Sequence, residues 1–178
     1  IYNYAYYPQH MEKLGYEKDA DWLEMKMSVP DEVPEKYAHV AQLTMQRYNL
    51  HIKKITMDDI KKRHYGHKIF NLINEAYAPL FGYSKMTDKQ MDLYVKTYLP
   101  MLDLSMLTLV EEDGTNDLIC VGISMPSMVK ALQKSGGKLF PFGWYHLLKS
   151  LKIKHEEGVE LLLIAARPDY QRKGVTAL

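Results

Sequence analysis

A polar turn near the end of the chain has the composition of an anion-binding loop. It reads Gln171-Arg172-Lys173-Gly174-Val175-Thr176 and follows the apolar run 159–166, which only Glu160 interrupts. Helix-compatible residues come next, and the first N–H groups of a helix have no intrahelical partner. These amides and the helix dipole both attract phosphate. Gly174 lets a phosphate approach the backbone closely. Arg172 and Lys173 are expected to add positive charge to this site, or else to form a solvated pair.

The spacing of this turn excludes two common phosphate-binding motifs. The Gly-x4-Gly-Lys-Ser/Thr pattern of a P-loop is absent from it, and a dinucleotide fingerprint needs more glycines than Gly174 alone. The turn must therefore bind an anion, if it binds one, by another arrangement of backbone amides.

The turn resembles the pyrophosphate loop of GNAT acyltransferases. That family carries Arg/Gln-x-x-Gly-x-Gly/Ala between its fourth strand and third helix, and Gln171 and Gly174 match the first and fourth positions. The preceding Arg167-Pro168-Asp169-Tyr170 matches the family's habitual strand exit, whereas Thr176 replaces the usual Gly or Ala. The resemblance spans roughly residues 51–178.

The resemblance implies an acyl-CoA-dependent N-acyltransferase that passes an acyl group, acetyl or another, directly to an unidentified amine. Loop amides would hold the CoA pyrophosphate, and the end of the strand would bind the pantetheine and the acyl carbonyl. The implied contacts are Ala165, Ala166 and Arg167 on the strand and Gln171, Arg172, Lys173, Gly174, Val175 and Thr176 in the loop. Two alternatives stay open: a non-catalytic GNAT-like CoA-binding or scaffolding domain, and an unrelated α/β interaction domain.

Direct transfer requires a base for the amine and a donor for the developing oxyanion. Glu160 is the candidate base, because a carboxylate in an apolar strand is suited to proton uptake. The alternative is a Glu facing solvent at the start of the strand. Tyr170 either contacts CoA or closes the turn. Cys120 is expected in the core, since direct transfer needs no thiol nucleophile.

Two further groups of residues could in principle form a site, one for a metal and one for the acceptor. His64 and His67 are three residues apart, but an isolated pair does not make a metal site, and none is predicted. The aromatic stretch from Phe140 to Trp144 either walls an acceptor pocket or packs as an ordinary insert.

The N-terminal segment shows a second resemblance to the family. His10-Met-Glu-Lys-Leu-Gly-Tyr16 resembles the closing helix-and-strand signature Tyr-Glu-Lys-x-Gly-Phe, which in the family follows the CoA loop. We interpret residues 1–30 as the tail of a preceding GNAT-like domain or a stray helix and strand, and expect contact with a second such domain. The tyrosine that often acts as general acid falls at Met11, so that role is not carried over.

The elements that must position the loop follow from periodicity and turn signals. A helix before Gly15, a strand over residues 22–29, a linker helix within 31–50 and a short strand at 51–55 come first. Apolar stripes predict helices near 69–76 and 87–98, the second with a capping box at Thr87 and Gln90. A hairpin about Asp113-Gly114, a helical insert and a central strand at 159–166, covered on both faces, complete the order.

This order predicts a mixed α/β (α+β) fold with a GNAT-like central mixed sheet flanked by helices and incomplete at the C-terminus. Residues 51–178 would form the N-terminal portion of that domain, through the CoA loop. The chain starts at Ile1 and stops at Leu178 inside a predicted helix start, so we expect a fragment of a longer protein.

Bulk composition narrows the classes of partner. The 178 residues have a formal net charge of +1, which argues against a dedicated nucleic-acid binder. No apolar run approaches the roughly 18 residues needed to cross a bilayer, so no membrane partner is expected. One cysteine cannot form an internal disulfide, and a reducing cytoplasm is the expected compartment.

Overall fold

The computed structural model describes residues 3–62, 64–98, 102–153 and 156–178. The chain divides into two units, residues 1–31 and 32–178. In the first unit, helix α1 (Tyr6–Lys13) is followed by Gly15 with a φ of 87°, which confirms the predicted helix and its glycine stop. The strand predicted over 22–29 is wrong: this segment has no regular structure, and its apolar side chains, such as Leu23, are exposed. Alternating residues form a strand only where a partner strand accepts their hydrogen bonds.

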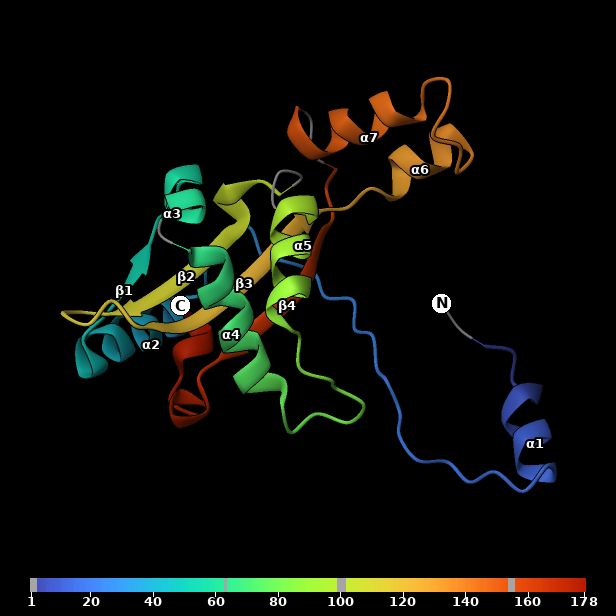
Figure 1. Ribbon diagram of the computed structural model, residues 1–178, viewed down its shortest axis with the longest axis horizontal. Coiled ribbons are helices and arrows are strands. Elements are labelled where there is room, and N and C mark those ends of the chain that lie inside the picture. Colours follow the sequence, from blue (N-terminus) through green and yellow to red (C-terminus); the bar gives the residue numbers. More distant parts are fainter. Residues whose placement is uncertain (1–2, 63, 99–101, 154–155) are drawn as a thin grey trace. The chain divides into compact units, whose positions relative to one another are not determined.

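The second unit is built on a four-stranded sheet in the order β1-β2-β3-β4, and every described pairing is antiparallel (Figure 1). The strands are β1 (Leu50–Lys53), β2 (Leu107–Glu112), β3 (Leu118–Pro126) and β4 (Val159–Ala166). The predicted hairpin about Asp113-Gly114 joins β2 to β3 and is confirmed, as is the α+β class. Gly114 has a φ of 88°, a conformation that suits glycine in a tight turn.

Three helices cover one face of the sheet: α3 (Met57–Lys62), α4 (Tyr65–Tyr77) and α5 (Asp88–Tyr98). The predicted stripe on α4 is buried and packs against the sheet through Ile69, Leu72, Ile73 and Ala76. The predicted capping box at the start of α5 is also confirmed. There the Thr87 backbone N–H donates to Gln90 Oε1 at 2.9 Å, and the Gln90 N–H donates back to Thr87 Oγ1 at 3.4 Å.

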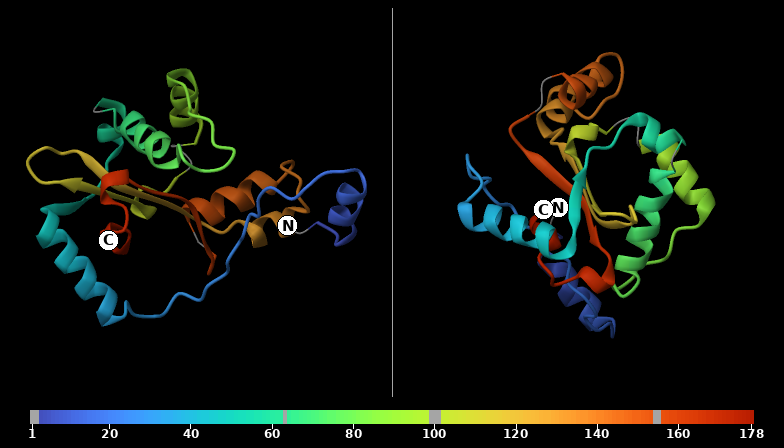
Figure 2. Two further views of the ribbon diagram at one scale, coloured as in Figure 1. Left: turned by 90° about the horizontal axis from the view of Figure 1, so that it is seen from below. Right: turned by 90° about the vertical axis from the view of Figure 1, so that its left-hand side faces the viewer.

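The opposite face carries helix α2 (Glu35–Tyr48) and the C-terminal turn, as Figure 2 shows. Two 3-10 segments, η3 (Pro168–Tyr170) and η4 (Val175–Ala177), make up that turn. A second cluster of buried side chains joins them to the sheet: Leu50, Val110, Ile119, Cys120, Ala166, Tyr170 and Val175. Helix α2, expected as a linker, therefore lies in the same unit as the loop and contacts it.

A helical insert separates β3 from β4, as predicted. Its helices α6 (Val129–Ser135) and α7 (Gly143–Lys152) pack on each other and project beyond the sheet, away from α2 to α5 (Figures 1 and 2). The Glu156 carboxylate accepts hydrogen bonds from the N–H groups of Lys130 and Ala131, at 3.0 and 2.8 Å, and so caps α6. A third 3-10 segment, η2 (Leu104–Met106), precedes β2. Across the described ranges, no helix has both the length and the apolar character needed to span a bilayer.

Strand β4 differs from its prediction as a central strand covered on both faces. It is the last strand of the described sheet, and only Ala165 and Ala166 are buried within it. An apolar run indicates a strand that could be covered, but it does not say which neighbours are present. The pairing of β4 with β3 also shifts between Leu161 and Leu163, which leaves Leu162 as the extra residue of a β-bulge.

Candidate functional site

The backbone of the C-terminal turn leaves several amides without an acceptor. The N–H of Gln171 donates to Arg167 O at 3.1 Å, and the N–H of Lys173 donates to Tyr170 O at 3.2 Å. Among the described residues, no acceptor is found for the N–H groups of Arg172, Gly174, Val175 and Thr176. Four of the six amides over 171–176 thus have no acceptor in the described residues, although Val175 is itself buried. Unpaired backbone amides of this kind are the groups that bind anions in proteins.

The chain conformation places these free amides close together. Arg172 and Gly174 both adopt the left-handed region, with φ values of 64° and 82°, and Gly174 is the N-cap of η4. Where left-handed residues alternate with right-handed ones, successive N–H groups turn toward one side and form an anion-binding concavity, and the two positive φ values two residues apart are compatible with that arrangement. Positive φ costs an ordinary side chain such as that of Arg172 of the order of 1–2 kcal/mol, which marks this residue as strained.

Gly174 is adjacent to helix α2. A Cβ built on Gly174 would lie 3.1 Å from Thr44 Oγ1 and 3.7 Å from Val40 Cγ1. Its missing side chain therefore gives room to α2, in addition to the freedom of the backbone at positive φ. Gly174 is thus needed for packing against α2 as well as for the predicted approach of a phosphate.

The three cations of the turn have different surroundings. Lys173 Nζ lies 4.5 Å from the centre of the Tyr170 ring and 5.2 Å from that of Tyr48, so two aromatic faces hold it. Arg167 donates to both oxygens of Asp169, with Nε–Oδ1 at 2.7 Å and Nη2–Oδ2 at 2.9 Å. Arg172 is exposed and has no ion-pair or ring partner within the described part of the chain. It is the cation of the turn that remains available to a ligand.

The Arg167–Asp169 pair shifts the titration of both groups. The hydrogen bonds from Arg167 lower the pKa of the Asp169 carboxyl below its ordinary value of 3.8, and the same bonds raise the pKa of Arg167. Both groups are charged at neutral pH. Their pairing holds the strand exit in one conformation next to the free amides.

Tyr170 closes the turn, which was one of its two interpretations. Its backbone N–H donates to Arg167 O at 2.8 Å, and its buried ring packs edge-to-face on Tyr48 at 5.8 Å. Its hydroxyl donates to Glu112 Oε1 at 3.1 Å. Burial, and then this hydrogen bond, raise the pKa of Tyr170, so the hydroxyl keeps its proton.

The open edge of β4 leads away from the turn. Tyr77 on α4 donates its hydroxyl to Ile164 O at 2.8 Å and accepts from the Ile164 N–H at 3.3 Å, so both polar groups of Ile164 face this edge. Because an antiparallel strand alternates, Ala166 faces the same edge and Ala165 faces β3. The Ala166 carbonyl accepts from Gln171 Nε2 at 3.2 Å, and the Arg167 N–H donates to Ile119 O at 2.8 Å. The three predicted strand contacts therefore differ. The backbone amides of Ala165 and Arg167 face β3, and of the three only the Ala166 N–H faces the edge.

The other candidates lie away from the turn. Glu160 is exposed near the start of β4, opposite Met125 and about 20 Å along the strand from Ala166. Cys120 is buried on β3, and burial raises its pKa to about 11, so its thiol is protonated at neutral pH. His67 Nε2 lies 2.8 Å from Asp92 Oδ1, and the residues that the structure describes contain no His, Cys, Asp and Glu group able to hold a metal.

The chain is distantly related to two bacterial proteins. It is 23% identical to the bacterial ceramide synthase of Caulobacter vibrioides (strain NA1000 / CB15N), over an alignment that covers 94% of this chain and 42% of that protein. It is 24% identical to Protein YghO of Escherichia coli (strain K12), with 93% of this chain and 41% of that protein covered. The chain therefore spans about two fifths of the length of these relatives. No family model matches the chain.

One buried carboxylate was missed by sequence reasoning. Glu111 on β2 is fully buried against α4; the Tyr65 hydroxyl donates to its Oε1, and Lys53 Nζ lies 3.8 Å from its Oε2. His51 Nε2 is 3.6 Å from the same oxygen. In the sequence, an acidic residue at an inward-facing position of a predicted strand would have indicated Glu111. The cluster lies on the face opposite the turn and serves there as a buried charge pair.

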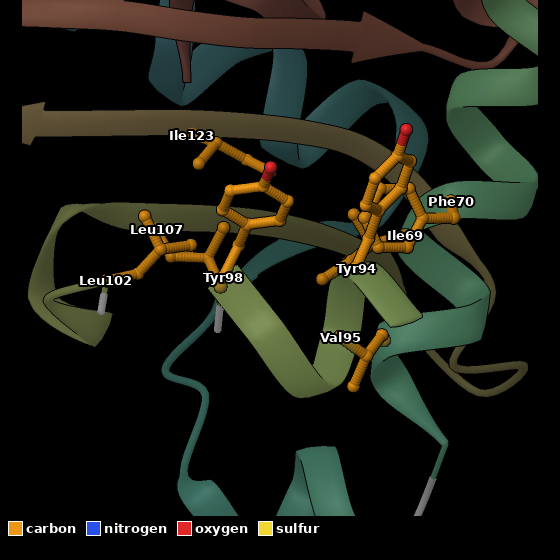
Figure 3. Close-up of a pocket in the computed structure, with 9 residues that line it drawn as sticks. Ile69, Phe70, Tyr94, Val95, Tyr98, Leu102, Leu107 and Ile123 are labelled. Atoms are coloured by element: carbon orange, nitrogen blue, oxygen red, sulfur yellow. The ribbon is translucent and has the colours of Figure 1, made fainter. Parts of the chain in front are cut away.

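An apolar pocket lies between α5 and the sheet on that same opposite face (Figure 3). Tyr94 of α5 lies beside Ile69 and Phe70 of α4, and Tyr98 of α5 lies beside Leu107 and Ile123 of the strands; Gly66, Val95 and Leu102 complete the lining. A ligand site needs a few convergent polar groups to orient its substrate, and this lining has no charged side chain. The pocket is a packing seam, and the turn remains the candidate site.

Proposed function

We propose that this chain supplies the CoA-binding part of an acyl-CoA-dependent N-acyltransferase, which passes its acyl group directly to an amine. The observation that carries the proposal is the set of unpaired amides at Arg172, Gly174, Val175 and Thr176 in a turn that follows a strand. A pyrophosphate would accept hydrogen bonds from these amides, and the exposed Arg172 would add a charge-assisted contact.

The edge of β4 away from β3 suits part of the remainder of the cofactor, next to Ala166, whereas at Ile164 the Tyr77 hydroxyl already bonds both backbone groups. CoA carries an extended arm with two amide groups, and an extended chain with amides can add to a free strand edge. The Ala166 N–H lies on that edge beside the turn, where the arm would leave the pyrophosphate. The bulge at Leu162 interrupts the ladder further along, in the way that bulges mark strands next to active sites.

One of the two relatives, the bacterial ceramide synthase, supports the same bond-forming chemistry. A ceramide is an amide of a fatty acid and a long-chain amino alcohol, so a ceramide synthase joins an acyl group to an amine. The identity to that protein is 23%, which supports acyl transfer to nitrogen and leaves the acyl chain and the amine of the present protein open.

The proposed step exchanges one bond for another and needs a base. The amine nitrogen attacks the thioester carbonyl, the new C–N bond forms as the C–S bond breaks, and the CoA thiolate leaves and takes up a proton. A base must remove the proton of the amine. Glu160, the candidate from the sequence, lies about 20 Å along β4 from Ala166 and is too far away to serve an amine held beside that residue. Cys120 has no role, because its buried thiol is protonated.

One observation favours the alternative of a CoA-binding domain without catalysis. Glu160 is exposed to solvent, so the apolar surroundings that suit a base are absent around it in the described residues. An assay of thiol release from acetyl-CoA and longer acyl-CoAs, over a panel of amines and with the intact protein, separates the two functions. Release that depends on the amine supports the transferase, and binding of CoA without release supports the alternative.

Binding at the turn is tested by a pair of substitutions at one exposed position. Thr176→Pro removes one of the unpaired N–H groups near the start of η4, where proline is tolerated, and Thr176→Ala keeps that N–H and removes only the hydroxyl. Calorimetric titration with CoA is expected to show a loss of about tenfold or more for Thr176→Pro and little change for Thr176→Ala. Circular dichroism checks that both variants fold, and equal affinity of the two variants would rule out the turn as the site.

A further inference from the structure

The insert between β3 and β4 differs in charge from the rest of the chain. Residues 127–153 contain five lysines and one histidine but no Asp or Glu, whereas the whole chain has a formal net charge of only +1. Lys130 lies 3.9 Å from Glu157, and Lys152 donates to Leu102 O at 2.8 Å. Lys134, Lys138 and Lys149 are exposed and have no acidic partner in the described ranges.

The insert also exposes most of its large apolar side chains, and most of the residues that it buries are small. The residues buried in α6 and α7 are Ala131, Gly143, Ser150 and Leu151. Nine large apolar residues are exposed instead: Val129, Leu132, Leu139, Phe140, Phe142, Trp144, Tyr145, Leu148 and Ile153. Phe140 and Phe142, in the connection between the helices, are 75% and 69% exposed. An ordinary surface helix shows the reverse arrangement, with its apolar stripe facing the core.

We propose that α6, α7 and the connection between them dock on the surface of an anionic lipid bilayer. Exposed aromatic and aliphatic side chains would enter the boundary between headgroups and acyl chains, and the lysines would lie among the anionic headgroups. The projection of the two helices from the sheet leaves this segment accessible (Figures 1 and 2). Docking in the plane of the interface needs no bilayer-spanning helix.

Two other occupants fit the surface less well. The core of a protein–protein interface is depleted of lysine, whereas here lysines are interspersed with the apolar residues, and the acids of the insert, Glu156 and Glu157, both follow α7. A nucleic acid would bind the lysines through its phosphates but would leave Val129, Leu132 and Leu148 exposed to water. Of these three occupants, an anionic lipid surface satisfies both the charge and the exposed aliphatic side chains.

The test is co-sedimentation of the intact protein with vesicles of phosphatidylcholine mixed with phosphatidylglycerol, compared with vesicles of phosphatidylcholine alone. The wild-type protein is expected to bind the mixed vesicles more tightly. Phe140→Ser with Phe142→Ser should weaken binding by about tenfold or more, since two exposed rings no longer enter the lipid. Lys134→Glu with Lys138→Glu should remove the preference for anionic lipid, at roughly fivefold per lysine.

Matched controls come from the segment between α4 and α5 and from α5 itself. Phe81 is 59% exposed, and Lys85 and Lys89 are exposed on that part of the chain. Phe81→Ser, and Lys85→Glu with Lys89→Glu, are expected to leave vesicle binding unchanged. Calorimetric CoA titration of the same variants keeps this test separate from that of the turn.

Two results would overturn the proposal. The first is wild-type protein that stays in the supernatant with both kinds of vesicle. If the Phe140→Ser and Phe142→Ser protein then also melts at a lower temperature than wild type, a protein surface and not lipid covers the segment. The second is binding that the insert variants and the control variants reduce equally.

Discussion

Gly174 lies directly against Thr44: a Cβ on Gly174 would come within 3.1 Å of Thr44 Oγ1, although the two residues belong to segments far apart in the chain. Helix α2 thereby holds the backbone from which the unpaired amides project, and Thr44 is itself buried. The geometry of the candidate site depends on this contact as much as on the turn's own residues.

Gly174→Ala is therefore expected to destabilise the second unit by about 1–3 kcal/mol, from positive φ and from contact with Thr44. In the Gly174→Ala background, Thr44→Ala should restore the stability that is lost through contact with Thr44 but not the stability that is lost through positive φ. The two substitutions should therefore be coupled. Chemical denaturation of the single and double variants measures this coupling. Strictly additive effects would mean that α2 does not restrict position 174.

Arg172 and Lys173 are neighbours with different expected effects. Arg172→Ala should weaken CoA binding by about tenfold with little loss of stability, because its guanidinium is free for a phosphate. Lys173→Ala should instead lower the free energy of unfolding by roughly 1 kcal/mol, since it removes a cation held between Tyr48 and Tyr170. Calorimetry and denaturation of both variants provide the comparison, and the reverse assignment of effects would contradict the structure.

The pH dependence of the turn is expected to follow Asp169. Because Arg167 lowers the folded-state pKa of Asp169, the stabilisation is complete above the ordinary pKa of 3.8 and is lost as the pH falls through the folded-state pKa. NMR signals of the Arg167 Nε–H should stay constant from neutral pH down to about pH 4 and change only below it. Asp169→Asn should abolish this acid transition. A change of these signals near pH 6 would contradict the assignment.

Cys120 is expected to be chemically inert in the folded protein. Burial raises its pKa to about 11, so at about pH 8 only roughly one thiol in a thousand is ionised, and solvent does not reach it. A thiol reagent should react with native protein very slowly and with denatured protein at once. Fast reaction of the native protein would show that β3 is more accessible than the structure indicates.

Several elements could be predicted from the sequence because their causes are local. The capping box of Thr87 and Gln90 involves residues three apart, and the hairpin at Asp113-Gly114 needs only a turn between two apolar runs. The stripe of α4 repeats within one helix. The prediction of a strand over 22–29 was wrong because an alternating segment forms a strand only beside a partner strand. The presence of a partner cannot be detected within the segment itself.

The sequence alone determined that a polar, glycine-containing turn follows an apolar strand, and hence that a group of backbone amides lacks helical partners there. Only the tertiary structure decided which groups of that turn are free. Lys173 is held by Tyr48, and position 174 is confined by Thr44, both on α2, whereas Arg172 faces solvent. Such contacts join segments that are distant in the chain, so they follow from packing and not from local spacing.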